Sequence, residues 1–350
     1  MKRTIQIILL AIIVSSNLGN VCFGDGSSTS KSKTPYTVEE QRAITKGLDW
    51  LASQQTRSGR WNGPGGRYPA AMTAMAGIAL SCEGSTATQG KYSANIRRAI
   101  DYLTAQSQPN GLIGSQLDDR YIYGHGFAML FLSQALGEEE DADRRATLID
   151  VLTRAVVFSG QAQTSNGGWG YVSAKEGNDF DEGSTTITQV QGLRGCRNAG
   201  IPVPKEIIDK AVNYIHRCTN DDGGVIYSLK SGGGGRPAIT AAAVSCLLNA
   251  GEYDDSCVER QLEYCKKNLD NLSSSGMGYW HYAHYYYAQV KYRAGGDDWE
   301  TYRSQMSKRL LSEMQPNGSW TQGYNGPVMT SAINLTILQL NKGLLPIYQR

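Results

Sequence analysis

The chain has 350 residues, of which 40% are hydrophobic, 19% are charged and 40 are glycine. This balance supports a full hydrophobic core, and it excludes an intrinsically disordered chain and a collagen-like repeat. The 34 Lys and Arg residues nearly match the 32 Asp and Glu residues, so the charge offers no electrostatic basis for nucleic acid or anionic lipid as the main partner.

The first 24 residues have the order of an export signal. Lys2 and Arg3 precede an apolar run over residues 5–14, and small and polar residues follow as far as Gly24. The run is about ten residues long, well short of the roughly 20 that a membrane-spanning helix needs. We therefore expect export to the periplasm or the cell exterior, with cleavage near Gly24.

The rest of the chain divides into a linker and one folded domain. Residues 25–36 are mostly Ser, Thr and Lys, which is typical of a polar linker, and helical patterning covers residues 37–350. We expect no transmembrane span in the mature chain. Lipid modification at Cys22 is the alternative to cleavage near Gly24.

Two kinds of helix are predicted to alternate along the domain. Helices of the first kind are amphipathic and charged, as outer helices are, whereas those of the second kind are apolar all round, as inner helices are. The first kind is expected over residues 37–54, 92–107, 142–160, 203–218, 255–268 and 297–314. The second kind is expected over residues 69–82, 122–136, 185–198, 237–250, 280–294 and 327–339.

A short glycine motif lies between the two helices of each pair. Its clear copies are Gly59-Arg60-Trp61, Gly111-Leu112-Ile113, Gly167-Gly168-Trp169, Gly223-Gly224-Val225 and Gly318-Ser319-Trp320, with a degenerate copy at Gly278-Tyr279-Trp280. Recurrence roughly every 40 to 56 residues indicates an array or a ring. The fold class predicted is therefore all-α: a closed α/α toroid of six outer and six inner helices with a central cavity. An open helical solenoid is the alternative, although it would need polar caps at its ends.

Six cysteines remain after the expected cleavage, and none forms a Cys-x-x-Cys pair. Cys246 and Cys257 flank a short turn at residues 251–254, which makes them the pair able to form a disulfide in an exported protein. Two unpaired, buried thiols are the alternative.

The glycine motif also carries a family resemblance. The segments Gln55–Trp61 and Gln163–Trp169 read Gln-x-x-x-Gly-x-Trp, which resembles the repeat shared by squalene and hopene cyclases and protein prenyltransferase β subunits. The resemblance extends over about residues 37–349 and implies the toroid fold. Because these repeat residues brace helix hairpins, it implies no particular reaction. The run from His281 and the ending Leu-Pro-Ile-Tyr-Gln-Arg are most similar to exported, single-domain bacterial members.

An acidic segment directly precedes the third inner helix. Asp179, Asp181 and Glu182 resemble the Asp-x-Asp-Asp acid motif of class II terpene cyclases, so the resemblance implies that they are the catalytic residues if the protein is an enzyme. Such chemistry needs a proton held by paired carboxyl groups, whose mutual repulsion raises a pKa. The register is offset by three residues, because alignment on Leu193 brings Ser184 to the proton-donating position. A helix cap is therefore the alternative interpretation.

The prenyltransferase resemblance also raises a zinc site made by Asp, Cys and His on inner helices. The chain has four histidines, at 125, 216, 281 and 284, and His216 lies on an outer helix. No inner helix carries the Asp-x-Cys pair. We expect no metal ion and no cofactor.

The fifth inner helix is the third candidate site. Five of the 20 tyrosines fall within Tyr279–Gln289, and aromatic rings with polar tips suit an apolar cavity that orients a ligand. The expected ligand-binding residues are His125, His281, Tyr282, His284 and Tyr285. Packing between the two rings is the alternative for these side chains.

Three functions remain open from the sequence. The first is binding of an apolar or isoprenoid-like molecule, or of a peptide end, in the central cavity. Parallel inner helices would gather their N-termini at one mouth and favour an anionic head group there. The second is a minimal terpene cyclase or prenyltransferase-type enzyme, and the third is a scaffold that binds protein partners on its outside.

Overall fold

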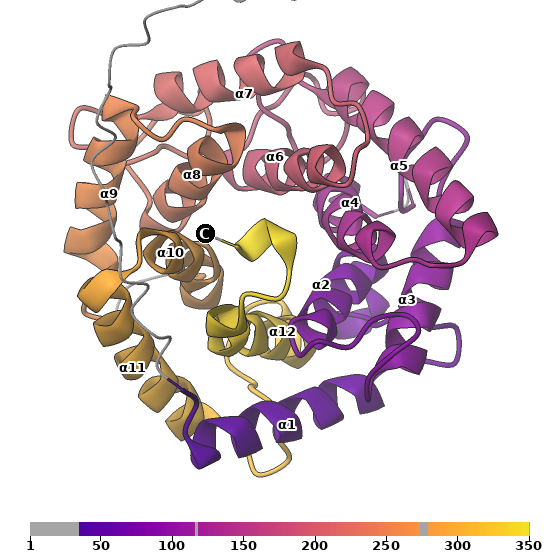
Figure 1. Cartoon of the computed structure of the whole chain (residues 1–350). Coiled ribbons are helices and arrows are strands. Elements are labelled where there is room, and N and C mark those ends of the chain that lie inside the picture. Colours follow the sequence, from indigo (N-terminus) through magenta and orange to yellow (C-terminus); the bar gives the residue numbers. More distant parts are fainter. Residues whose placement is uncertain (1–34, 116–117, 274–278, 350) are drawn as a thin grey trace, which may run out of the picture. The chain divides into compact units, whose positions relative to one another are not determined.

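The computed structural model describes residues 35–115, 118–273 and 279–349, which form α-helices and short 3₁₀ helices arranged as a ring (Figure 1). No β-strand occurs in these ranges. The expected export signal over residues 1–24 lies outside them, as does the linker up to residue 34. Within the same ranges, every helix is too short or too polar to span a membrane.

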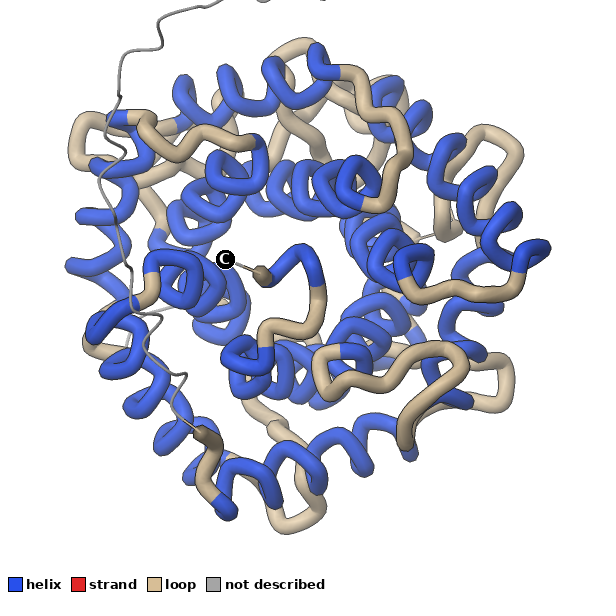
Figure 2. Tube along the Cα trace, in the orientation of Figure 1, coloured by secondary structure: helices blue, strands red, loops and turns tan. Residues whose placement is uncertain are grey.

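Two concentric layers of helices make up the ring (Figure 2). The outer layer consists of α1 (Val38–Ser53), α3 (Ser93–Ala105), α5 (Ala142–Ala162), α7 (Lys205–Cys218), α9 (Ser256–Leu269) and α11 (Gly296–Glu313). The inner layer consists of α2 (Pro69–Ser81), α4 (Tyr121–Gly137), α6 (Gly183–Asn198), α8 (Pro237–Ala250), α10 (Trp280–Ala294) and α12 (Gly326–Gln339). The all-α toroid of six outer and six inner helices predicted from the sequence is confirmed.

The ring is closed. Each inner helix contacts the next one around the ring, and the last, α12, contacts α2. In the outer layer α1 contacts α11, where the carboxylate of Glu40 accepts a hydrogen bond from Ser307 Oγ at 2.6 Å and lies 3.5 Å from Arg303 Nη2. The open solenoid is therefore wrong.

The repeat glycines bring each turn against the next outer helix. Gly167 has a φ of +96°, and a Cβ atom built on it would lie 2.3 Å from the carbonyl oxygen of Lys210 in α7. The other four repeat glycines meet a backbone carbonyl in the same way: Gly59 at Arg98, Gly111 at Arg154, Gly223 at Arg260 and Gly318 at Lys46. Lys46 belongs to α1, so the contact of Gly318 joins the last repeat to the first.

The glutamine and tryptophan positions of the motif brace the same turns. Gln163 Nε2 donates to the carbonyl of Gly167 at 2.7 Å and to that of Ile207 at 2.9 Å. Trp169 is fully buried, and its Nε1 donates to the carbonyl of Ser159 at 2.8 Å. These contacts agree with the bracing role expected for the repeat residues.

A further bond ties each of these five turns to its own inner helix. The backbone N–H at the aromatic or aliphatic position donates to a side chain in the first turns of that helix. The pairs are Trp61 with Thr73, Ile113 with His125, Trp169 with Thr186, Val225 with Thr240 and Trp320 with Ser331, at 2.9–3.1 Å. His125 thus occupies a position that hydroxyl residues hold in the other four of these five repeats.

The C-terminal segment fills one end of the ring. After α12 the chain forms the 3₁₀ helices η2 (Leu340–Lys342) and η3 (Pro346–Tyr348), and η3 lies inside the ring of inner helices (Figure 1). The N–H of Ile347 donates to Gln134 Oε1 at 3.2 Å, and the hydroxyl of Tyr348 lies 2.6 Å from that of Tyr285. Gln134 lies near the C-terminal end of α4. The segment therefore covers the opening of the ring at the C-terminal ends of the inner helices.

All six cysteines of the described residues are buried free thiols. Cys246 lies on the inner helix α8 and Cys257 on the outer helix α9, so the disulfide considered for this pair is not formed.

Candidate functional site

A cavity of about 780 Å³ occupies the N-terminal mouth of the inner ring. The residue that precedes each of the six inner helices contributes to its wall: Tyr68, Arg120, Glu182, Arg236, Tyr279 and Asn325. All six N-termini therefore point toward one space, where their partial positive charges favour an anion. The C-terminal segment, at the other end of the ring, does not contribute to this wall.

The wall combines apolar, phenolic, and polar or charged side chains, the last including Asp118, Lys267 and Asn271. Its apolar part consists of Ala71, Met72, Phe127, Pro237, Ala238, Ile239 and Met329. Seven tyrosines also line it: Tyr68, Tyr123, Tyr171, Tyr227, Tyr279, Tyr282 and Tyr324. Tyr279 and Tyr324 form an exposed edge-to-face pair at 5.7 Å between ring centres. Such a wall suits a mainly apolar ligand that carries a few polar groups.

Two arginines flank a pair of tyrosines in this wall. The guanidinium of Arg120 lies 4.5 Å from the ring centre of Tyr171, and that of Arg236 lies 4.5 Å from the ring centre of Tyr227. The hydroxyls of Tyr171 and Tyr227 hydrogen-bond to each other. Neither guanidinium has a hydrogen bond or ion pair with another residue that the structure describes, so both retain donors for a ligand.

Glu182 supplies a buried carboxyl group to the same wall. It is the N-cap of α6, is 1% exposed, and accepts hydrogen bonds from the N–H of Thr185 at 2.8 Å and from Ser184 Oγ at 2.7 Å. Burial raises the pKa of Glu182 above its ordinary value, although the hydrogen bonds from Ser184 and Thr185 act in the opposite direction. The hydroxyl of Tyr123 lies 3.3 Å away.

The other two acids of the expected catalytic set lie outside the cavity wall. Asp181 is fully buried, where it accepts hydrogen bonds from Tyr214 Oη at 3.0 Å and Ser228 Oγ at 2.8 Å. Asp179 adopts a φ of +55° and accepts hydrogen bonds from Ser165, which lower its pKa. Of the three acids, only Glu182 is placed to meet a ligand in the cavity.

The five expected ligand-binding residues are dispersed. Tyr282 lines the cavity, and its hydroxyl donates to the carbonyl of Ser184 at 2.7 Å. His281 opens onto an adjoining space of about 290 Å³ and donates from Nδ1 to Asn334 Oδ1 at 2.9 Å.

The remaining expected residues lie in the packed layers. His284 is buried against α11, where its Nδ1 lies 2.9 Å from Tyr302 Oη. Tyr285 is 1% exposed beneath the C-terminal segment. His125 is fully buried, accepts the N–H of Ile113 at Nδ1 and donates from Nε2 to the carbonyl of Ala155 at 3.2 Å.

Burial of His125 predicts a measurable pH dependence of stability. Burial lowers the pKa of His125 from about 6.5 to about 4. Between these values the unfolded chain binds a proton that the folded chain does not, so the free energy of unfolding should fall by about 3 kcal/mol as the pH drops through this window. His125→Thr puts a hydroxyl residue at this position, as in four of the other repeats. In denaturant titrations from pH 7 to pH 4, the free energy of unfolding of this variant should therefore fall by about 3 kcal/mol less than that of the parent. An unchanged slope would contradict a buried, neutral His125.

The arginines and the tyrosine pair were not predicted from the sequence. Tyr171 and Tyr227 each stand two positions after the last residue of the glycine motif, and Arg120 and Arg236 directly precede α4 and α8. Equivalent positions in successive repeats of a ring meet at the same mouth. Their shared position within the repeat is the sequence signal that would have predicted that these side chains lie together.

No protein-family model matches the chain, and neither does any curated protein sequence. Solved structures do match. The apo type II terpene cyclase MstE from Scytonema is 15% identical at a TM-score of 0.61, with 89% of this chain and 100% of that chain covered. An inactive variant of an α-1,6-mannanase of Salegentibacter sp., in complex with α-1,6-mannotriose, is 8% identical at a TM-score of 0.62, covering 87% of this chain and 99% of that one.

A D-mannose isomerase is 12% identical at a TM-score of 0.58, with 87% of this chain and 99% of that chain covered. At such identities the likeness concerns the fold and not the reaction. The described part of the chain is an α/α toroid of the terpenoid cyclase-like fold.

Proposed function

We propose that the protein binds an amphipathic molecule with an isoprenoid-like apolar part in the cavity at the N-terminal mouth. The observation that carries this proposal is the cavity itself, with about 780 Å³ of space lined by tyrosine, methionine and phenylalanine side chains together with polar and charged groups. A cavity of this volume and lining suits a ligand of that size and polarity.

The charged groups at the mouth orient such a ligand. Arg120 and Arg236 would hold an anionic or strongly polar head group, assisted by the N-termini of α4 and α8. The apolar tail would then lie along Met72, Phe127 and Ile239. With its charged end outward and its tail inward, the ligand would leave few polar groups unpaired.

Export of the protein belongs to the same proposal. The charged start, the short apolar run and the small residues up to Gly24 support transport out of the cytoplasm, and intact mass of the mature protein tests it. A carrier or receptor outside the cell would meet lipids and prenyl compounds at the cell envelope.

A cavity-filling substitution tests the binding proposal. Ala238 lies in the wall, so Ala238→Trp should weaken binding of a farnesyl phosphate probe at least tenfold, by calorimetry, because the indole occupies the ligand's space. Ala142→Trp, at an exposed site on α5, is the matched control and should bind like the parent. Farnesol should bind more weakly than farnesyl phosphate if the arginines hold the head group. Equal binding by both variants would refute the cavity as the site.

An enzymatic role is the second candidate, and Glu182 is the observation that favours it. A buried carboxyl group with a raised pKa on the wall of the cavity can donate a proton to a bound ligand. Under this proposal the parent would cyclise a polyprenyl substrate, and Glu182→Gln would abolish turnover without abolishing binding. If the parent binds the polyprenyl substrate but does not cyclise it, binding remains as the sole proposed function.

A further inference from the structure

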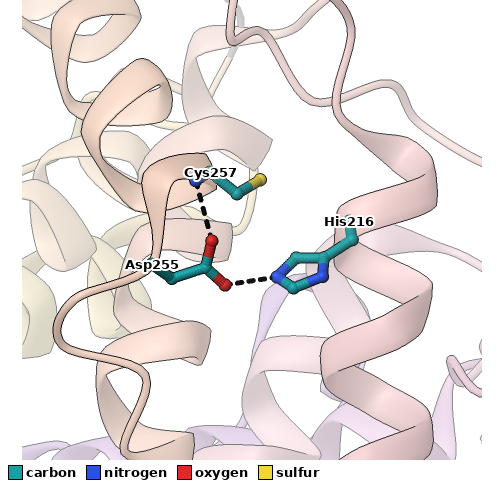
Figure 3. Close-up of side chains that lie close together, drawn as sticks. All are labelled: His216, Asp255 and Cys257. Carbon is teal, nitrogen blue, oxygen red and sulfur yellow. Dashed lines mark hydrogen bonds and ion pairs between the residues drawn. The ribbon is translucent and has the colours of Figure 1, made fainter.

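Two neighbouring outer helices bring a histidine, an aspartate and a cysteine together (Figure 3). His216 lies in the last turn of α7, Asp255 is the N-cap of α9, and Cys257 lies in the first turn of α9. His216 Nε2 is 2.5 Å from Asp255 Oδ2, and the three possible ligand atoms all lie within 4.8 Å of one another. None of the three residues lines the large cavity.

We propose that His216, Asp255 and Cys257 form a zinc site on the outer ring, although no metal ion was expected from the sequence. An imidazole nitrogen, a carboxylate oxygen and a thiolate sulfur are the three ligand types that Zn²⁺ takes in proteins. A carboxylate and a thiolate together neutralise the charge of the ion.

The carboxylate is already oriented for this role. Asp255 Oδ1 accepts the backbone N–H of Cys257 at 2.8 Å, which leaves Oδ2 directed at His216, as Figure 3 shows. Capping of α9 therefore holds the aspartate in place whether or not a metal binds. Such support of a ligand by a second hydrogen bond is the usual arrangement around protein metal sites.

The cysteine has a donor that would stabilise its thiolate. Gln261 is fully buried, and its Nε2 lies 3.4 Å from Cys257 Sγ and 2.9 Å from Thr219 Oγ1. Once the thiol proton leaves on metal binding, this amide N–H can donate to the sulfur. No group of the cluster needs to change its backbone position for that step.

Metal binding would require the ligand atoms to shift from their present positions. Zinc bonds of about 2.0 to 2.3 Å separate tetrahedral ligand atoms by roughly 3.3 to 3.8 Å. The His216 and Asp255 atoms must therefore move apart from their present hydrogen bond, and the sulfur must move inward. The side chain of His216 is 41% exposed, so the ion can enter from solvent and a water molecule can complete the coordination.

Zinc at this site would cross-link α7 and α9, the outer helices of successive repeats. Because the ligands assemble only in the folded chain, metal binding should stabilise the fold. This role is independent of the ligand cavity, and its failure would leave the proposed binding function untouched.

Cobalt(II) provides the test, because a thiolate ligand gives Co²⁺ an intense charge-transfer absorption. The reduced, metal-free protein titrated with CoCl₂ should develop this band and saturate near one equivalent, and ZnCl₂ should displace it. Cys257→Ser should abolish the band. Cys265→Ser is the matched control, since Cys265 lies on the same helix and is equally buried but has no part in the cluster.

His216→Ala gives a second, independent readout if Cys257→Ser does not fold. Its partly exposed side chain can be removed with little loss of packing, and Co²⁺ affinity should fall at least tenfold. ZnCl₂ should raise the melting temperature of the parent but not that of His216→Ala. A parent without the cobalt band, or a band that survives Cys257→Ser, would overturn the zinc site.

Discussion

Gly167→Ala should lower the free energy of unfolding by about 4 kcal/mol, combining roughly 1 to 2 kcal/mol of backbone strain with about 2 to 3 kcal/mol of overpacking. The strain arises because Gly167 has a φ of +96°, which an alanine resists. The overpacking arises because the new Cβ atom would lie 2.3 Å from the carbonyl oxygen of Lys210, which belongs to a helix backbone and cannot rotate away.

Gly200→Ala is the matched control for the strain alone. Gly200 has a φ of +86°, and nothing lies within 4 Å of a Cβ atom built on it. Its substitution should cost only about 1 kcal/mol. If chemical denaturation gave equal losses for the two variants, the close approach of each turn to the next outer helix would not be what stabilises the ring.

Tyr285→Ala should lower the free energy of unfolding by about 3 to 5 kcal/mol, as for other large aromatic side chains removed from a core. Tyr285 is 1% exposed, packs edge to face on Tyr286 at 4.8 Å and bonds the hydroxyl of Tyr348 at 2.6 Å. Binding in the cavity should persist in the variant, because Tyr285 does not line its wall.

Tyr285→Phe separates the ring from the hydroxyl. It removes the bond to Tyr348 and keeps the packing, so it should cost only about 1 kcal/mol in the same denaturation experiment. A Tyr285→Ala variant that keeps the parental melting temperature and loses the ligand would instead place this ring in the binding site.

The repeat architecture was predictable because its determinants are local. A glycine with positive φ, a glutamine that caps the turn and an apolar inner helix each leave a mark in a short stretch of sequence, as at Gln163, Gly167 and Trp169. Closure of the ring depends instead on the small rotation between repeats, summed over all six. The sequence predicted a closed ring because an open solenoid would need polar caps at its ends, and the contact of α12 with α2 confirms the closure.

The candidate site was harder to predict because a side chain's direction depends on turn length and helix rotation. Glu182 and Asp181 are adjacent in sequence, yet the first lines the cavity and the second is buried against Tyr214. His125 looked like a ligand-binding group, whereas its position in the repeat makes it a substitute for a hydroxyl. Thr73 holds the equivalent position in the first repeat, so comparison with Thr73 rather than with other histidines would have indicated that role.

The fold alone does not determine which ligand binds, because this depends on the side chains of the cavity wall. Toroids of this shape include a terpene cyclase and a mannanase bound to a trisaccharide. In this chain the wall combines apolar and tyrosine side chains with polar and charged groups, among them Arg120 and Arg236. These side chains, rather than the fold, are the grounds for expecting a prenyl-type ligand over a sugar.

Mass spectrometry of the natively purified protein tests the binding proposal most directly. Organic extraction of protein isolated from its own cells should release an amphipathic, isoprenoid-like molecule at close to one per chain, and the amount should fall sharply in Ala238→Trp but not in Ala142→Trp. Recovery of a glycan, or of no small molecule from a correctly folded chain, would contradict the account.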